Sequence, residues 1–369
     1  MESVNALLAL EVIRHQIELQ RYEAGVVARM IAVLDRADKR IAAELAVALQ
    51  EIDPSLFKME RLESLLTSIR ELSKAAYEQI GKDMRDELKE FNAYELSYQH
   101  QALVTHLPAV VHVASVNANQ VYTAAMARPF QGVLLKEVWK DLDTQAMKRL
   151  RQTIANGFVE GKTTDQIIRE VRGTRANNFK DGIVEKSRRD IEAVVRTAIA
   201  NVAGVAQDNM MEANADLLKA VQWSSTLDTR TSQICRPRDG KLYTPVDHKP
   251  IGHKLPWLAG AGRSHWRCRS SQVPVLKSHK ELGIDVPEIV IEGKTRASMD
   301  GQVAAETTYA DWLKKQSAAR QDEVLGPTRG RLMREGKLSL DDMYSARGKP
   351  LTLDELRKKD AEAFKLAGL

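Results

Sequence analysis

The chain has 369 residues, of which 43% are hydrophobic and only 5% aromatic, and its Lys and Arg residues outnumber Asp and Glu to give a net charge of +5. That length allows two or three domains, and the mildly basic balance favours an acidic partner. The sequence has no apolar run near the roughly 20 residues of a membrane-spanning helix, no signal-peptide pattern and only two cysteines. We therefore expect a protein without a membrane span or a disulfide framework, made in a reducing cytoplasm.

Residues 1–127 are expected to form an extended helical region. Apolar residues recur in alternating steps of three and four from Leu10 to Ala48, with polar faults at Gln20 and Asp38. Two interpretations fit this stripe. It is either one arm of an intramolecular helical hairpin, or a docking helix that also allows self-association.

The rest of that region is predicted from turn signals. Asp53-Pro54-Ser55 indicates the turn after the first helix, and the leucines of residues 62–72 indicate a second helix. A third helix is expected over residues 85–105, followed by a strand or buried connector over residues 106–117.

Residues 128–222 are predicted to be a second helical segment, which begins with a linker at residues 128–132. Trp139 heads a helix that we expect to end at Asn156-Gly157, a helix C-cap signal. Thr163-Thr164-Asp165 then predicts the N-cap of a short helix over residues 166–171. A long alanine-rich helix should follow and reach about Leu218.

The next stretch, residues 223–280, differs in its chemistry. Residues 223–270 alone contain both cysteines, three of the eight histidines and three of the five tryptophans, and four prolines there exclude a long helix. Eleven Lys/Arg and three Asp give residues 223–280 a net charge of +8. Asp239-Gly240 predicts a type I′ hairpin turn with a return strand over residues 241–243. The fold class is therefore mainly α, with a small α+β central module that contains a β-hairpin.

Residues 281–369 are expected to be an extended and partly helical C-terminal segment. A short strand region is predicted over residues 282–291, and an exposed, flexible loop over residues 293–301. Thr352, with Glu355 three residues later, predicts a capped final helix.

The C-terminal segment has few apolar anchors, among them Trp312 and Leu325. They look insufficient for an independent core, so they should pack either on the helical body or on a partner surface. We list Trp312 and Leu325 as partner-binding candidates.

The central module carries a specific resemblance. The order Trp, Asp-x-Arg-Thr, Cys, Asp-Gly-Lys-x-Tyr and His-x-x-Cys-Arg resembles the core signature of the phage head morphogenesis family, the minor head proteins related to protein F of phage Mu. Many family members have two further cysteines where this chain has Ser232 and Ser270, which excludes a site of four thiolates. Arg196 matches an Arg-Thr position, and resembling stretches cover roughly residues 128–357. The matching module residues are Trp223, Asp228, Arg230, Thr231, Cys235, Asp239, Gly240, His265, Cys268 and Arg269.

The module offers a candidate metal site. Cys235, His265 and Cys268 are soft or borderline ligands, and His248 or His253 could complete a tetrahedral zinc site. Two reduced thiols, or a disulfide formed after the particle leaves the cell, are the alternatives. Because only three Cys/His ligands are firmly placed, we expect purified protein to hold zinc in substoichiometric amounts or none, and we predict no obligatory cofactor.

The module also offers candidate DNA contacts. Arg263, Arg267 and Arg269 could bind phosphates, while Trp266 stacks on bases. The competing interpretation is that the tryptophans are core anchors and the arginines solvate the module.

The resemblance implies a non-enzymatic minor head protein of a tailed phage, located inside the virion near the portal vertex and in the host cytoplasm during assembly. Its implied partners are the portal protein or the major capsid protein, and packaged double-stranded DNA. The sequence has no Gly-rich phosphate loop, Gly-x-Ser-x-Gly or His-Glu-x-x-His motif. The alternatives are a zinc-binding nuclease built on the Cys/His module and a DNA-binding adaptor unrelated to virions.

Overall fold

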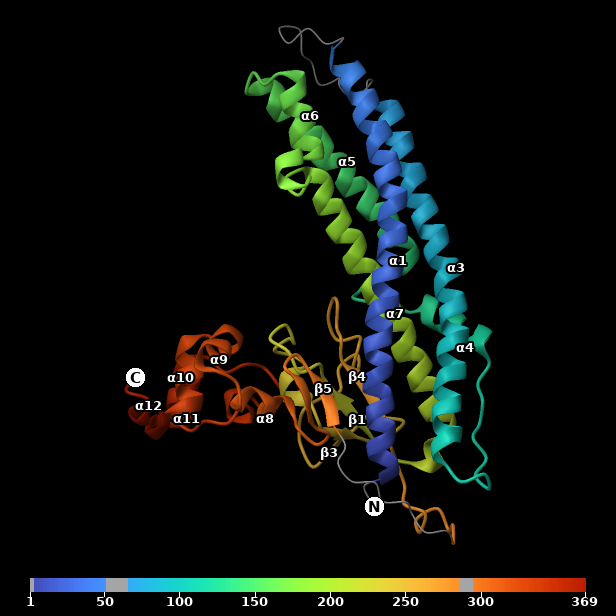
Figure 1. Ribbon diagram of the computed structural model, residues 1–369, viewed down its shortest axis with the longest axis vertical. Coiled ribbons are helices and arrows are strands. Elements are labelled where there is room, and N and C mark those ends of the chain that lie inside the picture. Colours follow the sequence, from blue (N-terminus) through green and yellow to red (C-terminus); the bar gives the residue numbers. More distant parts are fainter. Residues whose placement is uncertain (1–2, 51–65, 286–294) are drawn as a thin grey trace. The chain divides into compact units, whose positions relative to one another are not determined.

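The structure is a computed structural model that describes residues 3–50, 66–285 and 295–369. These residues are mainly α-helical, with a long N-terminal helix and a small antiparallel sheet, which confirms the predicted fold class (Figure 1). None of the described helices is both long and apolar enough to cross a membrane. The turn predicted at residues 53–55 and most of the strand predicted at residues 282–291 lie outside the described residues.

The helices and strands keep the chain order shown in Figure 1. The helices are α1 (Ser3–Gln50), α3 (Thr67–His106), α4 (Ala118–Ala127), α5 (Leu135–Val159), α6 (Thr164–Arg172), α7 (Ile183–Ala213), α8 (Tyr309–Lys314), α9 (Ala318–Leu325), α10 (Pro327–Arg334), α11 (Leu353–Lys359) and α12 (Ala361–Leu366). The strands are β1 (Leu218–Ser224), β2 (Leu242–Tyr243), β3 (Pro250–Ile251), β4 (Ser271–Leu276), β5 (Thr295–Ser298) and β6 (Gly301–Ala304).

The chain divides into two compact units that cut across its helices. One unit takes Met1–Leu19, Asn92–Val121 and Ala200–Leu369, and we call it the sheet unit; the other takes Gln20–Phe91 and Tyr122–Ile199, and we call it the helical unit. The four domains predicted at residues 1–127, 128–222, 223–280 and 281–369 stay a prediction.

In the helical unit, side chains of α1, α3, α5 and α6 share one hydrophobic core. Leu45, Ile69, Ile154 and Ile167 are almost completely buried in it. The predicted N-cap at Thr163 is confirmed, because its hydroxyl accepts from the Gln166 backbone N–H and the Gln166 side chain accepts from that of Thr163.

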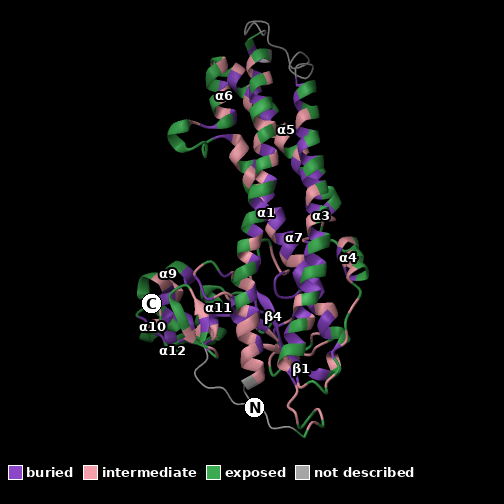
Figure 2. Cartoon of the chain, turned by 45° about the vertical axis from the view of Figure 1, so that its right-hand side comes forward, coloured by how far each residue is buried: buried purple, intermediate pink, exposed green. Residues whose placement is uncertain are grey.

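The buried face of α1 differs from the predicted stripe. Ile17 and Ala24, which lie on that stripe, have exposed side chains, whereas the polar His15 and Glu23 are buried. Figure 2 shows buried and exposed residues alternating along α1. A count of apolar residues misses this face, because polar residues with partners occupy part of it. His15 Nε2 lies 2.7 Å from Glu95 Oε2 within the sheet unit.

The second and third helices predicted from the sequence are one helix, α3. Gly81, near the expected break, lies inside it, and a Cβ there would come within 2.8 Å of the Trp139 ring. The absent side chain therefore gives room to a tryptophan of α5, and the helix continues through it.

Gly157 likewise lies inside a helix rather than ending it, so the predicted C-cap was wrong. Helix α5 continues to Val159, and Gly161, with φ of +69°, follows its end. A Cβ at Gly157 would lie 2.5 Å from Ile167 Cγ1. The glycine therefore allows α5 and α6 to approach closely.

In the sheet unit, four strands form an antiparallel sheet in the order β3-β2-β1-β4. Trp223 on β1 lies opposite Gln272 on β4. The Gln272 side chain donates to the Gly204 carbonyl and to Asp208 on α7. Asn5 of α1 bonds both backbone groups of Leu276, which ends β4. Helices α1 and α7 therefore attach directly to the sheet.

The C-terminal segment has a core of its own, which corrects the expectation that its anchors are too few. Trp312 is 1% exposed and Leu325 is 9% exposed, and both pack in this core together with Leu227 of the central module. Their predicted partner-binding role is therefore wrong, since these side chains bury on the chain itself. The loop predicted at residues 293–301 is also wrong in part, because β5 and β6 pair as a hairpin. The capped final helix at Thr352 is confirmed.

We expect Gly157→Val to destabilise the helical unit by about 1–3 kcal/mol, the usual cost of overpacking a core. The matched control is Gly25→Val, since a Cβ at Gly25 has only the Arg29 guanidinium within 4 Å. That variant should change stability by less than about 0.5 kcal/mol. Chemical denaturation of the three proteins measures the difference, and equal midpoints would contradict the close α5–α6 approach.

Candidate functional site

Two short turns hold the Cys/His residues of the central module. In the first, the Cys235 N–H donates to the Ser232 carbonyl over 3.0 Å and to its hydroxyl over 3.3 Å. In the second, the Cys268 N–H donates to the His265 carbonyl over 3.2 Å. Within the second turn, Arg267 has φ of +57°, a left-handed conformation that a non-glycine residue seldom adopts. Local backbone geometry therefore sets the direction of both thiols.

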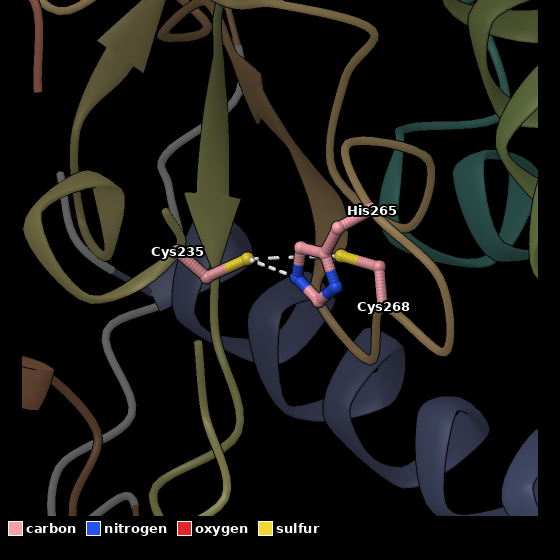
Figure 3. Close-up of side chains that lie close together, drawn as sticks. All are labelled: Cys235, His265 and Cys268. Carbon is pink, nitrogen blue, oxygen red and sulfur yellow. Dashed lines mark hydrogen bonds between the residues drawn. The ribbon is translucent and has the colours of Figure 1, made fainter. Parts of the chain in front are cut away.

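The two turns bring three side chains together, as Figure 3 shows for Cys235, His265 and Cys268. The two sulfurs are 3.7 Å apart, and Cys235 Sγ lies 3.2 Å from His265 Nε2. One ligand atom from each residue lies within 4.8 Å of the others. Both cysteines are buried, and they form no disulfide with each other. We call these three residues the Cys/His cluster.

The hydrogen bond between the two cysteines shifts their pKa values in opposite directions. The bond from Cys235, followed by that with His265, holds the pKa of Cys268 well below its usual range despite burial. The same pairing with Cys268, and then burial, raises the pKa of Cys235. Burial lowers the pKa of His265, but its hydrogen bond and charge interaction with Cys268 outweigh this and raise it. Such a group of soft donors can bind a thiophilic metal ion.

The fourth predicted ligand, His248, does not join the cluster, so that part of the prediction was wrong. Its ring stacks on Trp257 with centroids 4.6 Å apart. Burial lowers its pKa. His253 is also elsewhere, with Nε2 2.8 Å from the Leu242 carbonyl oxygen. The polar neighbour that the cluster does have is Ser232, whose hydroxyl lies 2.8 Å from His265 Nε2.

Two of the three predicted DNA-binding arginines have carboxylate partners inside the sheet unit. Arg269 makes a bidentate pair with Asp228, at 2.6 and 2.8 Å. Arg263 pairs with Asp208 on α7. The structure therefore leaves Arg267 and Trp266 as the predicted contacts with exposed side chains.

The family-motif residues act mostly as supports. Trp223 is fully buried and meets Trp257 edge-on at 5.2 Å, and Thr231 bonds to the Asp228 carboxylate. Arg230 is exposed near Asp228. In the helical unit, Arg196 bonds Glu192 over 2.9 Å.

The turn at Asp239-Gly240 differs from the predicted type I′. Asp239 has φ of −57° and ψ of 127°, and Gly240 has φ of +78°, which is the type II pattern. The Lys241 N–H donates to the Arg238 carbonyl across the turn. The type differs because the Asp239 carboxylate is drawn inward, where the backbone N–H groups of Ser225 and Tyr309 donate to it over 2.6 and 2.7 Å.

Arg296 completes this buried network, although no sequence pattern marks it as a site residue. Its guanidinium lies 3.2 Å from Asp239 Oδ2, and both side chains are almost fully buried. It also donates to the carbonyls of Ser225 and Thr307. Nothing local in the sequence marks this pair, because the two residues are 57 positions apart.

Residues 148–273 match the family model described as Phage Mu protein F like protein. The matched stretch runs from within α5 to β4 and includes the Cys/His cluster. This confirms, over residues 148–273, the resemblance to the phage head morphogenesis family. Neither the curated proteins nor the solved structures include a significant match to the chain.

We expect Asp239→Asn to destabilise the sheet unit by about 3–5 kcal/mol, because it leaves the Arg296 charge buried without a counter-ion. The control is Glu335→Gln, which breaks an exposed pair with Arg331 and should cost less than about 1 kcal/mol. Thermal unfolding compares the two variants. A small effect at Asp239 would show that the buried pair is dispensable.

Proposed function

We propose that this chain is a non-enzymatic minor head protein that binds the portal protein or the inner capsid surface while a tailed phage assembles its head. The family match over residues 148–273 is the observation that supports this most. The proposal places the protein inside the virion near the portal vertex, and in the host cytoplasm before that.

The arrangement of the module favours a structural role over a nuclease. A metal-dependent nuclease needs carboxylates or histidines free to bind its metal. Asp228 and Asp239 are instead engaged by Arg269 and Arg296. A cysteine nucleophile must meet its substrate, whereas Cys268 is 3% exposed.

The helical unit carries a loop suited to a protein partner. We call residues 172–182 the docking loop; it follows α6 and is mostly exposed (Figure 2). Asn178 and Phe179 have φ of 51° and 60°, two consecutive left-handed residues that are not glycine. Such a conformation is unfavourable and persists where surrounding contacts impose it.

Those contacts centre on Asp181. Its carboxylate accepts hydrogen bonds from the Thr174 backbone N–H and hydroxyl and from the Asn177 side chain, all at 2.7–2.8 Å. These bonds hold its pKa far below its usual range. At the base of the loop, Gly173 and Gly182 approach so closely that a Cβ on Gly182 would lie 2.2 Å from Gly173 N. The docking loop is therefore held in one conformation before any partner binds.

The loop presents an apolar ring among cations. Phe179 is 38% exposed, with the Arg172 guanidinium 5.8 Å from its ring centroid. Arg175 and Lys180 are exposed beside it, while the single acidic residue, Asp181, is used internally. A preorganised aromatic residue ringed by positive charge suits an acidic protein surface with an apolar pocket.

The first test is incorporation. The protein should co-purify with mature particles and with portal-containing assembly intermediates, as measured by quantitative mass spectrometry of gradient-purified heads. Its absence from both would reject the head role and favour the adaptor alternative.

The second test concerns the docking loop. Phe179→Ala should lower affinity for the head partner by about tenfold or more, the scale of an aromatic anchor. Val159→Ala is the matched control, since Val159 is another exposed apolar residue of the same unit. Pull-down of isolated portal and of empty capsids by the full chain reads out both variants.

Equal binding by both variants would show that the docking loop is not part of the interface. It would leave the proposed head role unaffected. Electrophoretic shift of duplex DNA is measured in parallel. If Phe179→Ala weakened DNA binding and left portal and capsid binding unchanged, the loop would be a nucleic-acid contact instead.

A further inference from the structure

The geometry of the Cys/His cluster matches a tetrahedral zinc site. With zinc–sulfur bonds of about 2.3 Å and tetrahedral angles, two thiolates lie about 3.8 Å apart. The observed separation of the Cys235 and Cys268 sulfurs is 3.7 Å. The Cys235 Sγ–His265 Nε2 distance of 3.2 Å needs to open by only a few tenths of an ångström to reach the about 3.5 Å of a tetrahedral site.

His265 is oriented as metal-binding histidines are. Its Nδ1 lies 2.9 Å from the Trp266 carbonyl oxygen, which can only accept, so Nδ1 carries the hydrogen. The other ring nitrogen, Nε2, then faces the two sulfurs (Figure 3). A backbone carbonyl in this second position fixes the tautomer and raises the basicity of the ligand nitrogen.

Among the described residues, a hydroxyl rather than a fourth strong ligand lies beside the Cys/His cluster. Ser232 Oγ lies 2.8 Å from His265 Nε2. A serine hydroxyl is absent from the usual zinc ligand set, so a water bonded to Ser232 is the expected fourth ligand.

We propose that Cys235, His265 and Cys268 bind one zinc ion, with a water held by Ser232 in the fourth position. Two thiolates neutralise the dication, so the filled site has no net charge and suits its burial. Binding releases the two thiol protons to solvent, and the imidazole keeps its hydrogen on Nδ1. Thiolate and imidazole donors favour zinc over hard cations such as Mg²⁺.

The ion would act as a staple within the sheet unit. Residue 232 lies eight positions after the end of β1, and residue 268 lies three positions before the start of β4. Side-chain contacts of the Cys/His cluster connect the two turns. One metal with ligands in both would hold them together independently of the head role. With three protein ligands the ion should exchange, so protein as purified can contain less than one zinc and still bind one when it is supplied.

The test uses the full chain, reduced and stripped of metal with a chelator. Co²⁺ should bind one per chain with a thiolate-to-cobalt absorption band, and Zn²⁺ should displace it. Cys268→Ser should abolish the band, while His248→Gln, which alters the histidine that lies outside the cluster, should leave it unchanged. Ser232→Cys supplies a fourth strong ligand and should tighten zinc binding beyond the roughly 10- to 100-fold effect of an outer-shell change.

If Cys268→Ser misfolds, the Ser232→Cys variant still tests the proposal. The proposal is overturned if the reduced parent, with two titratable thiols, takes up neither ion, or if Ser232→Cys binds zinc no more tightly than the parent. Because this assay needs no portal or capsid, its failure is distinct from failure of the head role.

Discussion

The ion pair between Asp239 and Arg296 is the constraint on which the sheet unit depends. A carboxylate and a guanidinium removed from water lose several kcal/mol of hydration each, which only close pairing and further hydrogen bonds can offset. Here Asp239 also accepts hydrogen bonds from the backbone N–H groups of Ser225 and Tyr309. Arg296 in turn satisfies two carbonyls. Each of these bonds fixes a different segment at one point.

That network explains why the C-terminal segment folds with the central module. The Tyr309 N–H at the start of α8 bonds to Asp239, and the Tyr309 hydroxyl donates to the Asp228 carbonyl over 2.9 Å. Leu227 of the module lies in the core that Trp312 and its neighbours form. Removal of residues 306–369 would therefore expose Leu227 and deprive Asp239 of a donor. The C-terminal segment therefore has its own core, which Leu227 of the central module joins, and is not an attached tail.

Interactions between residues close along the chain could be predicted from the sequence, whereas most interactions between distant residues could not. The N-cap at residues 163–165 and the capping box at Thr352 depend on residues within one helical turn, and both were predicted with their helices. The sequence predicted that Cys235, His265 and Cys268 lie close together, because cysteine and histidine are both common zinc ligands. The burial of His15 was not, because its partner Glu95 lies 80 positions away. Buried polar residues on an apolar face follow pairings that no local pattern records.

The positive charge of residues 223–280 has a structural use that its sequence did not indicate. A module with many turns leaves backbone carbonyls without strand partners, and an unpaired buried carbonyl is costly. Arg236 is buried and donates to the carbonyls of Thr231 and Val324. Arg238, also buried, donates to those of Pro256 and Ile234.

Arginine suits this task because its five donors lie in a fixed planar fork and its charge is retained on burial. With Arg263 and Arg269 paired to carboxylates, four of the module's arginines serve its own structure. A basic net charge is evidence for a nucleic-acid partner only to the extent that the cations face solvent. Four of the module's arginines hold its turns together, whereas Arg230, Lys249 and Arg267 have exposed side chains.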